Sequence, residues 1–411
     1  MNQPAKQPFL LNKEFAWYVT ARLIFLAGLR MTPVLLGWKL YEVTGSKLSL
    51  GVLGLSEVIP AILLALPAGV KIDRSNKQRL ISICMLLYFA IMIGMLFITS
   101  DYFIKSNSTS VVQWSIYGLV AATGAMRAFS SPAFNAFLSQ MVLPTQLVRA
   151  TSINSMAWLL AAVIGPGVAG LLMGYTNVTV AFTVVSSLVL IAVFCMQNVK
   201  QKPVLFKPGN ARTWESVKEG INFILTQKAL LGSMTLDMFA VLFGGVTALL
   251  PVFAKDILHV GPEGLGWLTA ATYLGNFIAI AALTWKPMKN KQGQKLFYVI
   301  GGFGICILIF ALSQNFWLSF AALFVSGLFD GVSVIIRGTV LQLFVPDEMR
   351  GRVSSVSSIF INSSNELGQF ESGTAASIMG TVPSVIFGGC MTLIVVTITW
   401  FKAPTLRKLE Y

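Results

Sequence analysis

Long apolar runs alternate with short polar connections along the whole chain. About 20 apolar residues are needed to cross the hydrocarbon core of a bilayer. By that measure the 411 residues contain twelve candidate spans. We predict transmembrane helices at roughly 15–41, 48–70, 79–99, 111–138, 150–174, 178–198, 229–254, 263–285, 296–313, 316–345, 353–380 and 383–402. The pattern therefore predicts an all-α membrane protein with twelve transmembrane helices.

The longest polar connection, residues 199–228, divides these spans into two sets of six. This division predicts an N-terminal six-helix bundle at 1–198, a linker at 199–228 and a C-terminal six-helix bundle at 229–411. Within the linker, apolar residues recur at helical spacing beside charged ones, which predicts an amphipathic helix on the cytoplasmic surface. Its apolar positions are Trp214, Val217, Ile221 and Ile224.

Composition excludes a soluble protein, because 55% of the residues are hydrophobic, 11% are charged and the mean hydropathy is +0.74. A net charge of +14 would suit a nucleic-acid-binding protein, but we place 22 of the 30 Lys and Arg in one alternating set of loops and termini. That asymmetry follows the positive-inside rule, so we expect both termini in the cytoplasm and no nucleic-acid partner.

Catalytic and cofactor chemistry have no signature in the chain. The four cysteines lie singly in apolar spans, where packing is the expected role. No glycine-rich phosphate loop followed by Lys-Ser or Lys-Thr is present, which argues against ATP hydrolysis. We therefore predict no enzyme activity, no catalytic residue, no cofactor and no bound metal.

Two short matches indicate that the six-helix unit is duplicated. Gly51–Pro60 resembles Gly266–Gly275 at an offset of 215 residues, and Gly165–Gly170 resembles Gly368–Gly373 at an offset of 203. Internal repeats of this kind are typical of transporters, in which substrate sites lie between the repeats. The matches therefore predict two pseudo-symmetric bundles.

The repeat relates the charged residues within the spans. At these offsets Arg22 corresponds to Asp237, and Arg127 corresponds to Asp330. Because charges in a span face a water-filled cavity or pair with one another, we hypothesise that the two arginines and two aspartates line a central cavity. In this cavity the four residues bind substrate, or the two arginines form ion pairs with the two aspartates. The alternative is a set of static ion pairs that join the halves.

Three further carboxylates lie in the spans, at Glu57, Glu366 and Glu371. A poorly hydrated site favours the neutral form of a carboxyl group, which is what a proton carrier needs. Together with Asp237 and Asp330 they are the candidate proton-coupling residues. A hydrogen-bonded structural role is the open alternative for each.

The charged turn at Leu66–Arg79 carries a family resemblance. Its residues resemble the signature between helices 2 and 3 of the major facilitator superfamily, with Asn76 and Gln78 departing from the usual pattern. The resemblance implies two six-helix bundles, alternating access, and a gating role for these residues. It also implies a contact of Asp73 near Arg352–Ser354, which suits a carboxylate at a helix N-terminus. The matching positions are Gly69, Asp73, Arg74, Lys77 and Arg79.

A second run, Gly165–Gly170, resembles the antiporter signature of proton-driven exporters, although Ala161 and Ala169 replace glycines. The resemblance implies gating roles for Gly165, Pro166 and Gly170, and the proline predicts a kink. Three other segments are similar to the superfamily subgroup of enterobactin and macrolide exporters: Trp38–Ser46, Arg149–Asn154 and Arg350–Ser354.

What this resemblance implies is a proton-coupled exporter of a small organic molecule in the bacterial inner membrane. Two arginines in the cavity favour a siderophore over a cationic drug. A multidrug or macrolide antiporter, a lipid flippase and a non-transporting receptor remain the alternatives. The expected partners are the substrate, protons and the lipid bilayer, and we expect a monomer.

Overall fold

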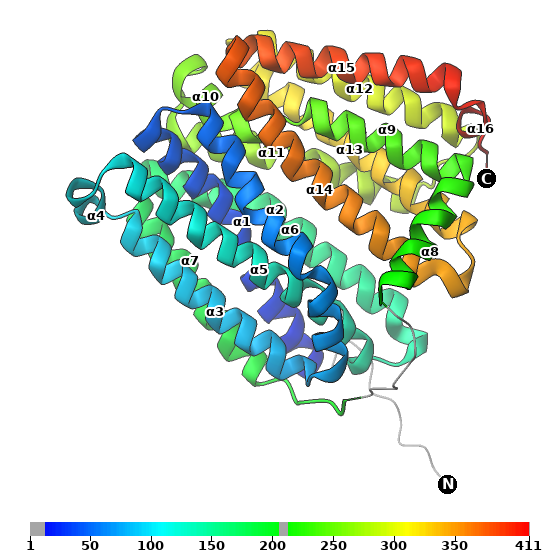
Figure 1. The fold of residues 1–411 in the computed structure, drawn as a ribbon, viewed down its shortest axis with the longest axis horizontal. Helices are drawn as coiled ribbons and strands as arrows, with labels where there is room; N and C mark the ends of the chain where they lie inside the picture. The colour runs from blue at the N-terminus through cyan, green and yellow to red at the C-terminus, as the bar shows by residue number, and fades with distance from the viewer. Residues whose placement is uncertain (1–12, 205–212, 411) are drawn as a thin grey trace. The chain divides into compact units, whose positions relative to one another are not determined.

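The structure is a computed structural model that describes residues 13–204 and 213–410. Long helices account for nearly all of the described chain (Figure 1). The first seven helices are α1 Lys13–Thr44, α2 Lys47–Arg74, α3 Lys77–Ile98, α4 Asp101–Ser106, α5 Thr109–Met141, α6 Leu147–Tyr175 and α7 Val178–Gln197. The remainder are α8 Thr213–Thr226, α9 Lys228–Gly244, α10 Leu250–Val252, α11 Gly261–Trp285, α12 Gln292–Leu312, α13 Phe316–Phe344, α14 Asp347–Met379, α15 Thr381–Lys402 and α16 Pro404–Arg407.

Among the described residues, ten helical segments are long and apolar enough to cross a membrane. Each coincides with a predicted span. The other two predicted spans, 111–138 and 353–380, coincide with α5 and α14. Both helices are long enough to cross a membrane, but neither is apolar enough to be counted among the ten. The all-helical membrane fold is confirmed, while the apolarity of the helices supports ten of the twelve spans.

The predicted span at 229–254 coincides with the apolar segment Lys228–Ile257, but this segment is not one continuous α-helix. Helix α9 ends at Gly244, and the chain continues through a 3₁₀ turn at Thr247–Leu249, α10 and a π-turn at Phe253–Ile257. A Cβ atom on Gly244 would lie 2.6 Å from the Phe303 ring, so a larger residue there would require the ring to move. Glycine weakens a helix, and the freed carbonyl of Gly245 accepts a hydrogen bond from the Ser372 hydroxyl at 2.8 Å.

Spatial proximity divides the chain into two compact units. Of the described residues, 13–39 and 59–204 belong to the N-terminal unit, and 40–58 and 213–410 belong to the C-terminal unit. Within the C-terminal unit, the hydroxyl of Tyr41 donates a hydrogen bond to Asp256. A Cβ atom on Gly51 would lie 3.1 Å from the Phe370 backbone, so α2 lies directly against α14 there.

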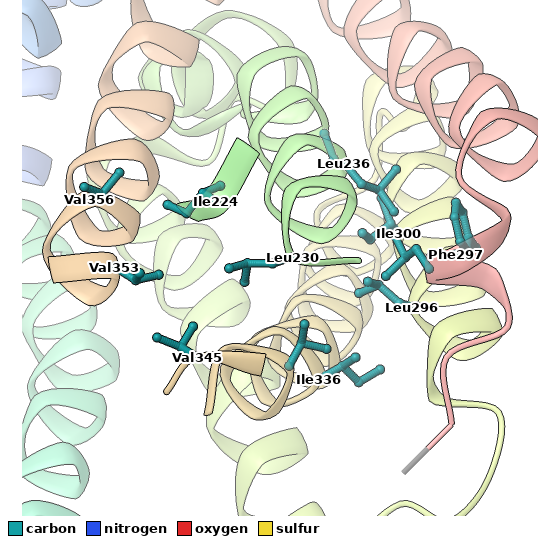
Figure 2. Packing of buried hydrophobic residues seen from close by; sticks show 13 residues of the cluster. Ile224, Leu230, Leu236, Leu296, Phe297, Ile300, Ile336, Val345, Val353 and Val356 are labelled. Atoms are coloured by element: carbon teal, nitrogen blue, oxygen red, sulfur yellow. The ribbon is translucent and has the colours of Figure 1, made fainter. Parts of the chain in front are cut away.

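The linker contains a helix, α8, at Thr213–Thr226. Ile224 lies in the buried core of the C-terminal unit with Val353 and Val356 of α14, as Figure 2 shows. Ile221 packs against the same core. The apolar side of α8 is therefore covered by protein. The side chains of Trp214 and Val217 lie outside the described residues.

The internal repeat is visible in a helix contact that occurs at matching positions of the two units. A Cβ atom on Gly165 of α6 would lie 3.0 Å from the carbonyl oxygen of Ala27 in α1. A Cβ atom on Gly368 of α14 would lie 2.9 Å from the carbonyl oxygen of Leu242 in α9. The offset of 203 relates the two glycines, and the offset of 215 relates Ala27 to Leu242. The Gly165–Ala27 contact of the N-terminal unit therefore corresponds to the Gly368–Leu242 contact of the C-terminal unit.

Candidate functional site

A cluster of charged side chains lies between α9, α11 and α13 in the C-terminal unit. Arg337 forms an ion pair with Asp237, and its Nη2 lies 3.9 Å from Oδ1 of Asp330. The amide of Asn276 donates to Oδ2 of Asp330 at 2.7 Å. Arg337 Nε donates to the Ser333 hydroxyl at 3.1 Å, which fixes the guanidinium on α13. The cluster thus holds two aspartates on one arginine.

The repeat in the sequence predicts that Arg22 and Arg127 hold these aspartates. In the structure, the arginine that pairs with Asp237 and Asp330 is Arg337. The spacing from Asp330 to Arg337 was the available signal, since residues seven apart lie on one face of a helix.

The C-terminal cluster has one carboxylate more than it has guanidinium groups. A cavity of about 20 Å³ opens beside it, which is enough for one water molecule. Its polar lining comes from Asp237, Asp330 and Ser333, and the rest is apolar. An unbalanced charge in poorly hydrated surroundings is costly. The cluster is therefore a place where a proton can be taken up to restore neutrality.

A second buried network lies between α1 and α5 in the N-terminal unit. Arg22 Nη1 donates to the Tyr18 hydroxyl, and both terminal nitrogens donate to Oδ1 of Asn135, each at 3.1 Å. Tyr18 donates in turn to the Phe134 carbonyl at 2.8 Å. The guanidinium also stacks on the Phe134 ring, with its carbon 5.2 Å from the ring centroid.

Every acceptor that Arg22 contacts is neutral. Only 8% of the residue is exposed, and its Nε has no hydrogen-bond partner. Within the described part of the N-terminal unit, no carboxylate lies within ion-pair distance of Arg22. A buried cation without a counter-ion is costly unless an anion binds beside it. Arg22 is therefore suited to bind an anion.

The two networks occupy equivalent places in the repeat. The offset of 215 relates Arg22 to Asp237, and the offset of 203 relates Phe134 to Arg337. The contact of Arg22 with Phe134 in one unit thus matches the ion pair of Asp237 with Arg337 in the other. The C-terminal unit supplies a counter-ion at this place, whereas the N-terminal unit supplies an aromatic ring.

The remaining candidate charged residues are spread over several helices. Arg127 is half-buried in α5, and Glu57 is half-buried in α2. Glu366 is buried in α14, while Glu371 is half-buried beside Ser372, whose hydroxyl lies 3.5 Å from Oε2. No three His, Cys, Asp or Glu side chains of the described residues gather as metal ligands.

The charged turn between α2 and α3 shows why two positions depart from the family pattern. The Asn76 side chain caps α3 by accepting from the Arg79 backbone N–H at 3.1 Å. The Gln78 side chain donates to the Met196 carbonyl at the end of α7, also at 3.1 Å. Both substituted residues therefore stabilise helix ends. Of the matching positions, Lys77 is buried, and a Cβ atom on Gly69 would meet nothing within 4 Å.

The glycine-rich run lies within α6, which continues through Pro166 without a break. Gly165 and Gly170 are buried, and Gly165 lies against Arg30 of α1. The guanidinium carbon of Arg30 lies 4.7 Å from the centroid of the Trp158 ring, also in α6. Arg30 and Trp158 are not among the predicted site residues, because hydropathy does not indicate which face of a helix meets a neighbouring helix.

Long apolar helices in two similar units, with charged side chains among them, are features of a membrane transporter. The transmembrane secretion effector model matches residues 6–410, so the chain belongs to that family within the major facilitator superfamily. The predicted superfamily membership is confirmed.

Two relatives are named for siderophores. The staphyloferrin A transporter of Staphylococcus aureus is 21% identical over 96% of this chain and 98% of its own length. The enterobactin exporter of Shigella flexneri is 24% identical over 72% of this chain and 70% of its own. The match to an uncharacterised transporter of Bacillus subtilis, 22% identical, spans 62% of this chain and 64% of that protein's length.

The same fold occurs in a bacterial homologue of the iron transporter ferroportin, solved in an inward-facing state. It is 15% identical and superimposes with a TM-score of 0.73, covering 98% of this chain and all of that chain (100%). This similarity shows the fold alone.

Proposed function

We propose that this transporter exports an anionic organic molecule of the siderophore class from the bacterial cytoplasm in exchange for protons. The observation that carries the proposal is the distribution of charge away from the helix ends. The N-terminal unit has three arginines there and no carboxylate, namely Arg22, Arg30 and Arg127. The C-terminal unit has one arginine, Arg337, and five carboxylates, namely Glu57, Asp237, Asp330, Glu366 and Glu371.

In this proposal the N-terminal unit binds the substrate. A carboxylate or catecholate group accepts hydrogen bonds from the guanidinium of Arg22 and supplies the negative charge that its neutral neighbours do not. A siderophore carries such groups, and two relatives are named for siderophores. A cationic drug would instead add to an existing excess of positive charge.

The C-terminal unit carries the proton. With both aspartates ionised, Arg337 balances only one of them. A proton on Asp237 or Asp330 neutralises the cluster and weakens one of the two contacts with Arg337. Alternating access follows when this change, together with substrate binding, shifts the balance between the two faces of the transporter.

A flux assay in inverted membrane vesicles tests the function. We expect metal-free siderophore to accumulate when the vesicle lumen is acid, with concurrent proton release. Dissipating the proton gradient abolishes accumulation. Asp330→Asn removes the response to the gradient, while the exposed control Arg149→Gln keeps it.

Two results of this assay would contradict the proposal. Accumulation of a macrolide but no siderophore would favour the multidrug alternative. Coupling that stays intact in all four carboxylate variants would exclude these residues as proton carriers. The variants are Asp237→Asn, Asp330→Asn, Glu366→Gln and Glu371→Gln.

A further inference from the structure

Arg30 is a second arginine in the middle of α1, eight residues beyond Arg22. At 1.5 Å and 100° per residue, the two Cα atoms are about 12 Å apart along the helix and roughly 80° apart around it. The side-chain partners agree with this geometry, because Arg22 bonds to Asn135 of α5 and Arg30 stacks on Trp158 of α6. The two guanidinium groups therefore lie at different depths, beside two neighbouring helices of the N-terminal unit.

The glycine-rich run of α6 fixes Arg30 against that helix. A Cβ atom on Gly165 would lie 2.7 Å from Cβ of Arg30, so α1 can come this close only where α6 has glycine. Trp158, two turns earlier, then receives the guanidinium on its ring, and 37% of this tryptophan is exposed. This contact holds the guanidinium carbon beside α6, and the N–H groups of a guanidinium have a spacing that matches a carboxylate.

Two buried polar atoms in the same helices have no hydrogen-bond partner. One is Arg22 Nε, and the other is Oδ1 of Asn154 in α6. Asn154 is 7% exposed and lies one turn before Trp158, on the same face of the helix. Buried polar atoms are nearly always satisfied in a folded protein, so each exception calls for an explanation. A polar ligand that enters between these helices would satisfy both.

We propose that Arg22 and Arg30 form a two-point site for elongated molecules with an anionic group at each end, separated by a distance on the order of the 12 Å rise between the two residues. Asn154 binds the polar spacer, and the group at Arg30 is planar, a carboxylate or a catecholate, in contact with Trp158. The proposal deepens the proposed function, on which it rests for the direction of transport. It names the substrate class as elongated dianions rather than anions in general.

Binding to the full-length protein in lipid nanodiscs tests the site without transport. The probes are polyethylene glycol chains of increasing length with a carboxylate at both ends, each compared by calorimetry with its monomethyl ester. We expect the diacid whose ends are separated by about 12 Å to bind at least roughly tenfold more tightly than its ester. Shorter diacids lose this advantage, because they cannot reach both arginines.

Variants identify the second point of contact. Arg30→Gln reduces the diacid-to-ester ratio to about one, and Arg30→Lys retains part of it by keeping the charge. The control Arg149→Gln, an exposed arginine on α6, leaves the ratio unchanged. Each variant is first shown to have the wild-type elution volume and unfolding temperature, so that a reduced ratio reports binding.

Different results would contradict the two-point site and the proposed export. Equal affinity for diacid and ester in the wild type, or an unchanged ratio in Arg30→Gln, overturns the two-point site while siderophore flux in vesicles still supports the exporter. A strong diacid preference without siderophore flux supports the site and overturns the proposed export.

Discussion

Charge counting at single residues explains why equivalent positions of the repeat should respond differently to substitution. Asp237 and Asp330 share Arg337, so the cluster keeps one ion pair when one aspartate is removed. It keeps none when the arginine is removed. An unpaired buried charge costs about 3–5 kcal/mol. The cost of a substitution therefore depends on whether the removed residue is the shared arginine or one of the two aspartates.

We predict that Arg337→Gln destabilises the protein by about 3–5 kcal/mol, whereas Asp237→Asn has a much smaller effect. The cost of Arg337→Gln should fall at low pH, because protonation neutralises the two aspartates that it leaves without a cation. Thermal unfolding in detergent between about pH 5 and 8 measures both effects. The double variant Arg337→Gln/Asp237→Asn should be more stable than Arg337→Gln alone. If the changes in unfolding free energy of the two single variants simply added, the shared ion pair would be contradicted.

We predict the opposite result at Arg22. Its guanidinium has neutral partners only, and glutamine can keep a hydrogen bond to Asn135 without burying a charge. Removal of the charge is favourable, so Arg22→Gln should lose no more than about 1 kcal/mol of stability, or gain stability, while binding of anionic ligands falls. Chemical or thermal unfolding gives the first quantity, and calorimetry with a siderophore gives the second. A loss of stability like that of Arg337→Gln would indicate a structural role for Arg22.

The sequence located Arg22 and Asp237 because the repeat relates them, and each proves to lie in a buried polar network of its own unit. It missed Arg337, whose role depends on which face of α13 meets α9. Hydropathy reports that a residue lies in a span, but it does not report the neighbour that the residue faces. The ion partner of a buried charge was therefore predictable only from the spacing of Asp330 and Arg337.

At the scale of helices, glycine positions set how closely neighbouring segments approach. Gly165 lies against α1 and Gly368 against α9, at equivalent places of the two units. Gly167 lies two residues from Gly165, and a Cβ atom added to it would have no neighbouring atom within 4 Å. The same residue type therefore has a packing function at two positions and none at the third.

We predict that Gly165→Ala and Gly368→Ala each destabilise the protein by about 1–3 kcal/mol, since the added methyl group overpacks a helix contact. Gly167→Ala should stabilise it by roughly 0.5–1 kcal/mol, because alanine favours the helix. Unfolding temperatures of the three variants provide the comparison. Equal effects at Gly165 and Gly167 would show that helix propensity, and not the contact with α1, determines the result.

Helix bounds followed closely from the sequence because the bilayer fixes the length of a span and requires its backbone to be hydrogen-bonded internally. The break after Gly244 did not, since the apolar run continues through it. Its cause lies in neighbours far along the chain, the Phe303 ring and the Ser372 hydroxyl. Long-range contacts of this kind leave no mark in a hydropathy profile.

At the scale of the whole molecule, the charges of the two units imply the electrical character of a transport cycle. Export of a dianion in exchange for one proton is equivalent to the inward movement of three positive charges. A potential of about 100 mV, negative inside the cell, contributes about 2.3 kcal/mol per charge. The proposed exchange would therefore gain about 7 kcal/mol from that potential. Exchange of a singly charged cationic drug for one proton would move no net charge.

We predict that siderophore uptake into inverted vesicles is accelerated by a lumen-positive potential, set with valinomycin and high external potassium at equal pH on both sides. The lumen of such vesicles corresponds to the outside of the cell, so this potential has the physiological sign. Asp330→Asn should remain sensitive to potential while losing its response to a pH gradient, because the anion still carries its own charge. Uptake that is insensitive to the potassium gradient would mean that the charges of substrate and protons cancel, which is incompatible with a dianion bound at Arg22 and Arg30.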